Sequence, residues 1–335
     1  MAKISVMQKD NISSMNVDIG GSMSSAQIRV NSKGNPVLII GLGGTGMDAL
    51  LCTKQLINTR FVLPESAPNK TTAIPDNIRV LGIDSDRTYF DKQREGGMRF
   101  AGNEYVSISS SVESYLANDH LIPEYVKEWL DDPKRLYSRV KGCGVDGANG
   151  IRQSGRVLLF NSIDKVVAVI QNDVKRLLTG MAPDQRLQVF VLSGISGGTG
   201  SGTFIDIPYI VRQIIENEGK ENYDIMGVLF TPDVNISRIS NPAIQKYVQR
   251  NGFAAIQELE YLMDMPDHHY DPFKQRYSST FAVSSENSPY DICLLISATG
   301  KGGFVQKDPN ERYDFSMSIA AEAVCNFIEI GRAHV

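Results

Sequence analysis

Two glycine-rich stretches hold the residues of this chain that are best suited to binding phosphate. The longer one, 193–203, reads Ser-Gly-Ile-Ser-Gly-Gly-Thr-Gly-Ser-Gly-Thr, and the shorter one, 41–46, reads Gly-Leu-Gly-Gly-Thr-Gly. Glycine allows the backbone to approach an anion closely and to adopt positive φ. A helix that begins in such a loop directs free N–H groups and its positive dipole end at the anion. Two such loops in one domain predict a triphosphate site.

The elements that must position these loops follow from the apolar pattern. A strand-like run precedes each loop and a helix-like segment follows it, so each loop joins a strand to a helix. The expected strands are 36–40, 78–83, 187–192, 225–230 and 291–296, and the main expected helices are 44–57, 156–178, 202–217 and 243–263. This alternation predicts an α/β fold with a Rossmann-like, mainly parallel sheet and helices on both faces. Ligands of such sheets bind at the carboxyl ends of the strands, where the glycine loops and Asp84 fall.

Four motifs, taken together and in order, resemble those of the tubulin/FtsZ superfamily. The stretch 194–202 is similar to its signature loop GGGTG[ST]G, with Ser196 at the first glycine, and 41–46 is similar to its first nucleotide loop. Gly147-Ala148-Asn149-Gly150, followed by Gly155-Arg156, resembles its γ-phosphate loop, although one residue is added and the proline is missing. Asp84-Ser85-Asp86 stands where its second loop approaches the metal and phosphates. The resemblance covers residues 36 to about 330 and fits the bacterial tubulin-like proteins best.

The resemblance implies a cytoskeletal GTPase that binds GTP or GDP with Mg²⁺ and assembles longitudinally with copies of itself into a filament. The nucleotide-binding residues that it implies are Gly43, Gly44, Thr45, Gly46, Asp84, Ser85, Gly147, Ala148, Asn149, Ser196, Gly197, Gly198, Thr199, Gly200, Ser201 and Tyr313. Asp84 and Asp86 are the implied metal ligands. Tyr313 would stack on the guanine base at the start of a central helix over 313–328, although Met317 stands where the family tends to place a polar base-reader. Asn251 is a further candidate near the base or ribose.

In the resembled family, hydrolysis is completed between subunits by acidic residues of a loop that follows the central helix. The last residues here, 329–335, match the translation of a common sequencing adapter. We therefore expect the natural chain to differ from this one past about Ile328, with the C-terminal domain missing, and we assign no catalytic residue. The expected organisation is an N-terminal segment 1–35, either weakly held or laid on the domain as a β-arm, and a GTP-binding domain over 36–312.

Composition excludes several other classes. The chain has 335 residues, a net charge of −4 and no basic block, which argues against direct nucleic-acid binding. No apolar run of about 18 residues is present, so we expect no membrane span. The four cysteines are far apart and form no CxxC pair, which indicates reduced thiols rather than a zinc site. Because the N-terminus also lacks the apolar centre of a signal peptide, we expect a cytoplasmic protein.

Alternatives to a GTPase remain open at this stage. The pattern GxGxxG in 41–46 also occurs in dinucleotide-binding domains, but there an acidic residue is expected about 20 residues after the last glycine, and Asp84 lies nearly twice as far. Neither loop ends in Gly-Lys-Ser/Thr, which excludes a P-loop. A non-hydrolysing GTP-binding scaffold or switch is the main alternative, and an enzyme that uses NAD or ATP is a weaker one. The adjacent His268 and His269 are interpreted as surface residues.

Overall fold

The structure is a computed structural model that describes residues 2–8, 11–17, 28–29, 34–62, 74–91, 98–118, 120, 122–130, 132–141, 147–267, 271–298 and 308–333. His268 and His269 lie outside the described residues. Whether the segment 1–35 is weakly held stays a prediction. In the described part of the chain, no helix is both long enough and apolar enough to cross a membrane.

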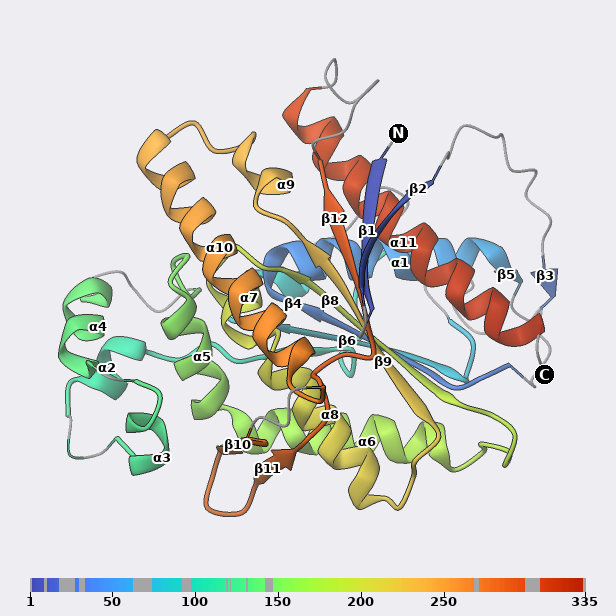
Figure 1. Cartoon of the computed structure of the whole chain (residues 1–335), viewed down its shortest axis with the longest axis horizontal. Coiled ribbons are helices and arrows are strands. Elements are labelled where there is room, and N and C mark those ends of the chain that lie inside the picture. Colours follow the sequence, from blue (N-terminus) through green and yellow to red (C-terminus); the bar gives the residue numbers. More distant parts are fainter. Residues whose placement is uncertain are drawn as a thin grey trace.

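An eight-stranded sheet forms the centre of the molecule, in the order β2-β1-β12-β9-β8-β4-β6-β7 (Figure 1). Its strands are β1 (Ala2–Gln8), β2 (Asn11–Val17), β4 (Val37–Leu42), β6 (Ile78–Asp84), β7 (Tyr105–Ser107), β8 (Leu187–Gly194), β9 (Tyr223–Phe230) and β12 (Ile292–Ser297). The six strands from β12 to β7 run parallel, and β1 and β2 extend the sheet in the antiparallel sense. The predicted α/β fold with a mainly parallel sheet is confirmed.

Helices cover both faces of this sheet, which explains why its strands are continuous apolar runs. Every residue of β4 and of β8 is buried. On one face, α1 (Gly43–Arg60) and α11 (Pro309–Ala333) pack side by side against the sheet (Figure 1). On the other face lie α5 (Arg152–Asn161), α6 (Ile163–Leu178) and α8 (Asp206–Asn217), with α10 (Pro242–Asp264) beside them.

The remaining elements are short. They are β3 (Ile28–Arg29), β5 (Phe61–Val62), η1 (Arg87–Asp91), α2 (Val112–Leu116), α3 (Glu124–Lys127), α4 (Pro133–Val140), α7 (Thr199–Thr203), α9 (Asp233–Ile236), β10 (Phe273–Arg276) and β11 (Ala282–Ser285). The helix predicted over 156–178 is in fact two helices, because Ser162 adopts φ −116° and ψ 10° between α5 and α6. The helix predicted over 202–217 is likewise two, α7 and α8. Apolar periodicity continues across both breaks, so the sequence pattern does not reveal them.

Candidate functional site

A cavity of about 210 Å³ lies where β4, β6 and β8 end. All four predicted loops contribute to it, so residues from four distant parts of the sequence meet at one point. The predicted site residues that line it are Gly43, Gly44, Thr45, Asp84, Ser85, Asp86, Gly147, Ala148, Gly197, Gly198, Thr199 and Gly200. Leu42, Tyr89, Gly150 and Gly194 complete its lining. This position, at the carboxyl ends of parallel strands, is the usual ligand position in such sheets.

Glycines are needed in the loops 41–46 and 193–203 because the backbones of these two loops contact each other. Gly43 has φ +64°, and a Cβ there would lie 2.6 Å from the backbone nitrogen of Gly200. A Cβ at Gly200 would in turn lie 2.9 Å from the carbonyl oxygen of Leu42. A Cβ at Gly198 would lie 2.7 Å from the Cβ of Ala148. Substitution of these glycines would therefore disturb the packing of the loops as well as any ligand.

Gly197 differs from its neighbours. It is exposed, and a Cβ at this position would meet no protein atom within 4 Å. It therefore lines the cavity without supporting another loop, which makes it the position where a side chain can obstruct a ligand at the least cost to the fold.

Asp84 is the most unusual charged group in the cavity. It ends β6, is only 3 % exposed, and accepts a hydrogen bond of 2.7 Å from the backbone N–H of Ser85. Burial raises the pKa of Asp84 to about 6, although the N–H groups of Ser85 and Asp86 act in the opposite direction. The hydroxyls of Ser85 and Thr199 lie 2.6 Å apart, which ties the loop after β6 to the loop after β8.

Asp84 and Asp86 fit the requirements of a Mg²⁺ ion that is held partly by phosphate. Mg²⁺ usually takes one or two carboxylates and completes its shell with phosphate oxygens and water. Both carboxylates line the cavity next to the glycine loops, and a cation would offset the burial that raises the pKa of Asp84. Among the described residues no group of three or more His, Cys, Asp or Glu side chains could hold a metal by itself. A Mg²⁺ ion held by Asp84 and Asp86 would have room in its shell for phosphate oxygens and water.

Four of the predicted residues shape the loops rather than line the cavity. A Cβ at Gly46 would lie 2.2 Å from the carbonyl oxygen of Leu192, so Gly46 lets α1 approach β8. Asn149 has φ 50°. Ser201 donates a hydrogen bond of 2.6 Å to the carbonyl of Ile195 and accepts one of 2.8 Å from Arg152. Ser196 is 1 % exposed.

Asn251, in α10, holds two of these loops together. Its Nδ2 donates to the carbonyl of Gly150 at 2.8 Å and to that of Ser196 at 3.0 Å. Asn251 is itself buried. The structure thus places this residue, considered above as a base or ribose contact, against the backbone of the 147–150 loop and the 193–203 loop.

Tyr313 lies beside the cavity rather than in its lining. Its hydroxyl donates to Oδ2 of Asp48 at 2.8 Å, and the hydroxyl of Tyr89 donates to Oδ1 of the same carboxylate. Burial raises the pKa of both phenols, so each keeps its proton as a donor. The guanidinium of Arg238 lies 4.0 Å from the centre of the Tyr313 ring, a cation–π contact over one of its faces. Met317 is fully buried in the core beneath α11.

Sequence reasoning missed Tyr89. It belongs to the short helix η1, and its hydroxyl also lies 3.0 Å from the carbonyl of Gly44. Its contacts are with α1 and α11, far away in the sequence, and no local pattern around 87–91 marks it.

Comparison with known proteins assigns the family. The sequence profile of the "Tubulin like" family matches residues 38–329. This chain therefore belongs to the tubulin-like family, as the four motifs predicted. No curated protein matches it.

Solved structures of tubulin-like proteins show only a distant likeness. FtsZ from M. jannaschii is 13 % identical, with 89 % of this chain and 55 % of that chain covered and a TM-score of 0.45. CetZ2 from Haloferax volcanii, solved as a GTPγS-bound protofilament, is 11 % identical, with coverages of 88 % and 59 % and a TM-score of 0.44. TubZ from Bacillus thuringiensis serovar israelensis is 10 % identical, with coverages of 86 % and 55 % and a TM-score of 0.43. This chain spans little more than half the length of each of these proteins.

Proposed function

We propose that this chain is the nucleotide-binding part of a tubulin-like GTPase and that its cavity binds GTP or GDP with Mg²⁺. The observation that carries the proposal is the meeting of two glycine loops, the 147–150 loop and a buried carboxylate in one cavity at the carboxyl ends of β4, β6 and β8. Each glycine loop leads directly into a helix, α1 or α7, and neither helix has an acidic residue in its first turn to repel an anion.

Each part of the cavity would have its own task. The N–H groups at the start of α1 and at Gly198–Gly200 would bind the α- and β-phosphates. The 147–150 loop would contact the γ-phosphate, and Asp84 with Asp86 would hold Mg²⁺. The bound metal would neutralise phosphate charge, which is the chemistry it supplies in phosphoryl transfer. The base would lie toward Tyr313, whose ring is fixed by Asp48 and Arg238.

We further propose that the protein forms longitudinal filaments in the cytoplasm and that hydrolysis is completed where two subunits meet. The γ-phosphate would order the loops near Asp84 and Asn149 and so change the surface that is offered to the next subunit. This part of the proposal rests on membership of the tubulin-like family.

The decisive measurement is equilibrium binding of a fluorescent GTP analogue to the chain, with Mg²⁺ present and with GTP, ATP and NAD as competitors. We expect displacement by GTP and GDP but not by ATP or NAD. Displacement by ATP or NAD alone would show that the cavity serves another class of nucleotide.

A pair of glycine variants tests the position of the ligand. Gly197→Val introduces a side chain into open space at the cavity and should weaken GTP binding by at least about tenfold, the equivalent of about 1.4 kcal/mol. Gly180→Val is the matched control, because Gly180 also has no atom within 4 Å of its Cβ position but follows α6 and does not line the cavity. Equal GTP affinity in the two variants would contradict the proposal that the glycine loops bind the phosphates of the nucleotide.

A further inference from the structure

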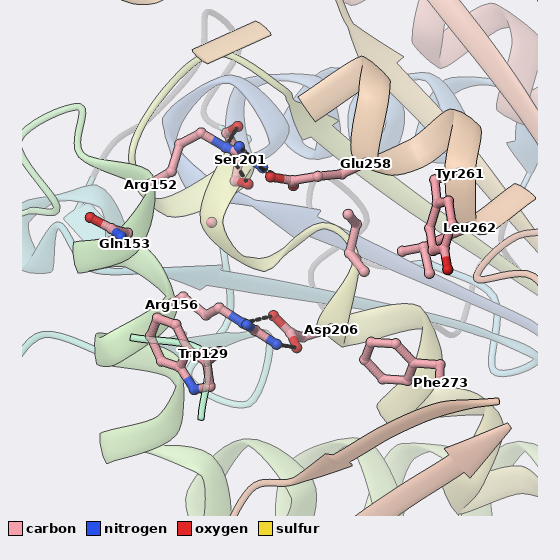
Figure 2. A pocket seen from close by; sticks show the side chains of 12 residues that line it. Trp129, Arg152, Gln153, Arg156, Ser201, Asp206, Glu258, Tyr261, Leu262 and Phe273 are labelled. Atoms are coloured by element: carbon pink, nitrogen blue, oxygen red, sulfur yellow. Dashed lines mark hydrogen bonds and ion pairs between the residues drawn. The ribbon is translucent and has the colours of Figure 1, made fainter. Parts of the chain in front are cut away.

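A second cavity, of about 370 Å³, is also lined in part by α7 (Figure 2). Thr199 and Gly200 of this helix line the first cavity, whereas Ser201 and Gly202 line the second. Its other walls come from α5, α8, α10 and β10, together with Trp129. The family motifs do not account for this cavity.

The charges in the wall of the second cavity neutralise one another. Arg156 forms two hydrogen bonds with Asp206, of 2.9 and 2.8 Å, and Figure 2 shows the two groups face to face. Arg152 forms a similar two-fold contact with Glu258, one hydrogen bond of which is 2.8 Å long. Among the described residues that line this cavity, no other side chain is charged. Because both arginines of the wall are already paired with carboxylates, a charged ligand would find no unpaired countercharge there, so the wall favours an uncharged ligand.

Most of the remaining wall is aromatic or aliphatic, and Gln153 and Ser201 add polar groups. Ile205, Leu262 and Phe273 face the cavity, and the ring of Phe273 stacks on Tyr209 with 4.0 Å between centroids and 5° between planes. The indole of Trp129 lies 4.5 Å from the guanidinium carbon of Arg156. Within the described part of the chain, the indole N–H has no hydrogen-bond acceptor. This nitrogen has almost no accessible surface, so a ligand in the cavity would contact the face or edge of the indole ring rather than its N–H.

We propose that this second cavity binds an uncharged molecule with two fused aromatic rings. Its volume is within the range of small-molecule sites. A dry cavity of about 150 Å³ already accepts one benzene ring, so two fused rings fit comfortably in this space. The apolar walls supply the contact area and the neutral charge pairs supply the selection against ions.

The same cavity is connected to the phosphate loop. Arg152 donates to the Ser201 hydroxyl at 2.8 Å and to Glu258 of α10, so one side chain joins the wall of the second cavity to the 193–203 loop. A molecule that packs against Arg152 would therefore also influence Ser201. By thermodynamic linkage, any factor by which it changes nucleotide affinity is the factor by which nucleotide changes its affinity. This second step rests on the proposed function, whereas binding in the second cavity does not.

The test uses coumarin, a neutral fused-ring lactone, and the fact that Trp129 is the only tryptophan in the chain. Incorporation of 5-fluorotryptophan gives a single ¹⁹F resonance in the cavity wall. We expect a saturable shift of this resonance when coumarin is added to the full chain without nucleotide. The variant Ile205→Phe fills the cavity and should weaken coumarin binding by about tenfold or more. Phe253→Ala is the control, because Phe253 is 66 % exposed on α10 and does not line the cavity.

The outcomes separate the two steps. The proposal is overturned if coumarin causes no saturable shift, or if Ile205→Phe, still folded by circular dichroism, binds coumarin as tightly as the parent chain. If coumarin binds and GTP affinity changes, coupling between the two cavities is supported, whereas an unchanged GTP affinity would overturn the coupling step alone. If coumarin binds while the chain fails to bind GTP at all, the second cavity stands and the proposed function fails.

Discussion

At the scale of single residues, Asp84 shows a conflict between stability and function. A carboxylate that is buried at the end of β6 is charged only at a cost, which the raised pKa of about 6 expresses. A phosphate-held cation would relieve that cost, because it favours the ionised carboxylate. Buried charge of this kind is typical of binding sites.

Substitution of Asp84 should therefore stabilise the free protein. The pKa of Asp84 rises from 3.8 in the unfolded chain to about 6 in the folded one, so stability is lost as pH rises through this window. Asp84→Asn removes the loss, and its free energy of unfolding at pH 7 should exceed that of the parent by up to about 3 kcal/mol. Below pH 4 the two should be equal. Urea unfolding at both pH values measures this, and a less stable variant at pH 7 would contradict it.

The same substitution should separate stability from nucleotide binding. The Mg²⁺-dependent GTP affinity of the parent chain should fall as pH drops below about 6, because Asp84 gains a proton. The Mg²⁺-dependent GTP affinity of Asp84→Asn should be low at every pH. Asp173→Asn is the matched control. Burial also raises the pKa of Asp173 to about 6, but this residue lies in α6 and does not line the cavity. It should gain stability without any loss of Mg²⁺-dependent affinity.

At the scale of elements, α10 fastens the loops that surround the cavity. Asn251 joins the 147–150 loop to the 193–203 loop, and Glu258, through Arg152, holds Ser201 of the latter a second time. Helix α10 is therefore part of the support of the site although none of its residues lines the first cavity.

Loss of the Asn251 amide should impair discrimination of the γ-phosphate. Asn251→Leu keeps the approximate shape but leaves two carbonyl oxygens without their donor, at a cost of about 1–3 kcal/mol in stability. Because only one of the two freed loops is expected to contact the γ-phosphate, the ratio of GDP to GTP dissociation constants should also approach one. Competition binding with both nucleotides measures the ratio, and Gln249→Leu, on the exposed side of the same helix, is the control. An unchanged ratio would show that Asn251 is merely structural.

Sequence reasoning located α10 to within a residue at each end but did not reveal this task. Helical periodicity is a local property, and it gives the bounds of an amphipathic helix well. The two acceptors of Asn251 are 101 and 55 residues away in the sequence, so nothing local to 243–263 indicates them. The glycine loops were predictable for the opposite reason, since each contains its own strand end, turn and helix start. Tyr89 was not, because its partners lie in other elements.

At the scale of the whole molecule, the strand order makes formation of the cavity depend on β8, the strand between β4 and β9. Strand β8 lies between β4 and β9, pairs in parallel with both, and is buried along its entire length. A chain that ends at Gly180, before β8, should therefore lack a cooperative thermal transition by circular dichroism, in contrast to the complete chain. A sharp transition in the shorter chain would mean that the N-terminal half folds independently.

The pairing of β4 with β8 has a consequence for synthesis of the protein. The loop at 41–46 leaves the ribosome long before the loop at 193–203 that completes the cradle. At about 5–20 residues per second, this interval is roughly 8–30 s. During this interval, β8 is not yet available to pair with β4 at the centre of the sheet. Nucleotide cannot stabilise the cavity, because the 193–203 loop that forms part of it has not been synthesised. The nascent chain is therefore most in need of chaperones before residue 200 emerges, whatever the concentration of nucleotide in the cell.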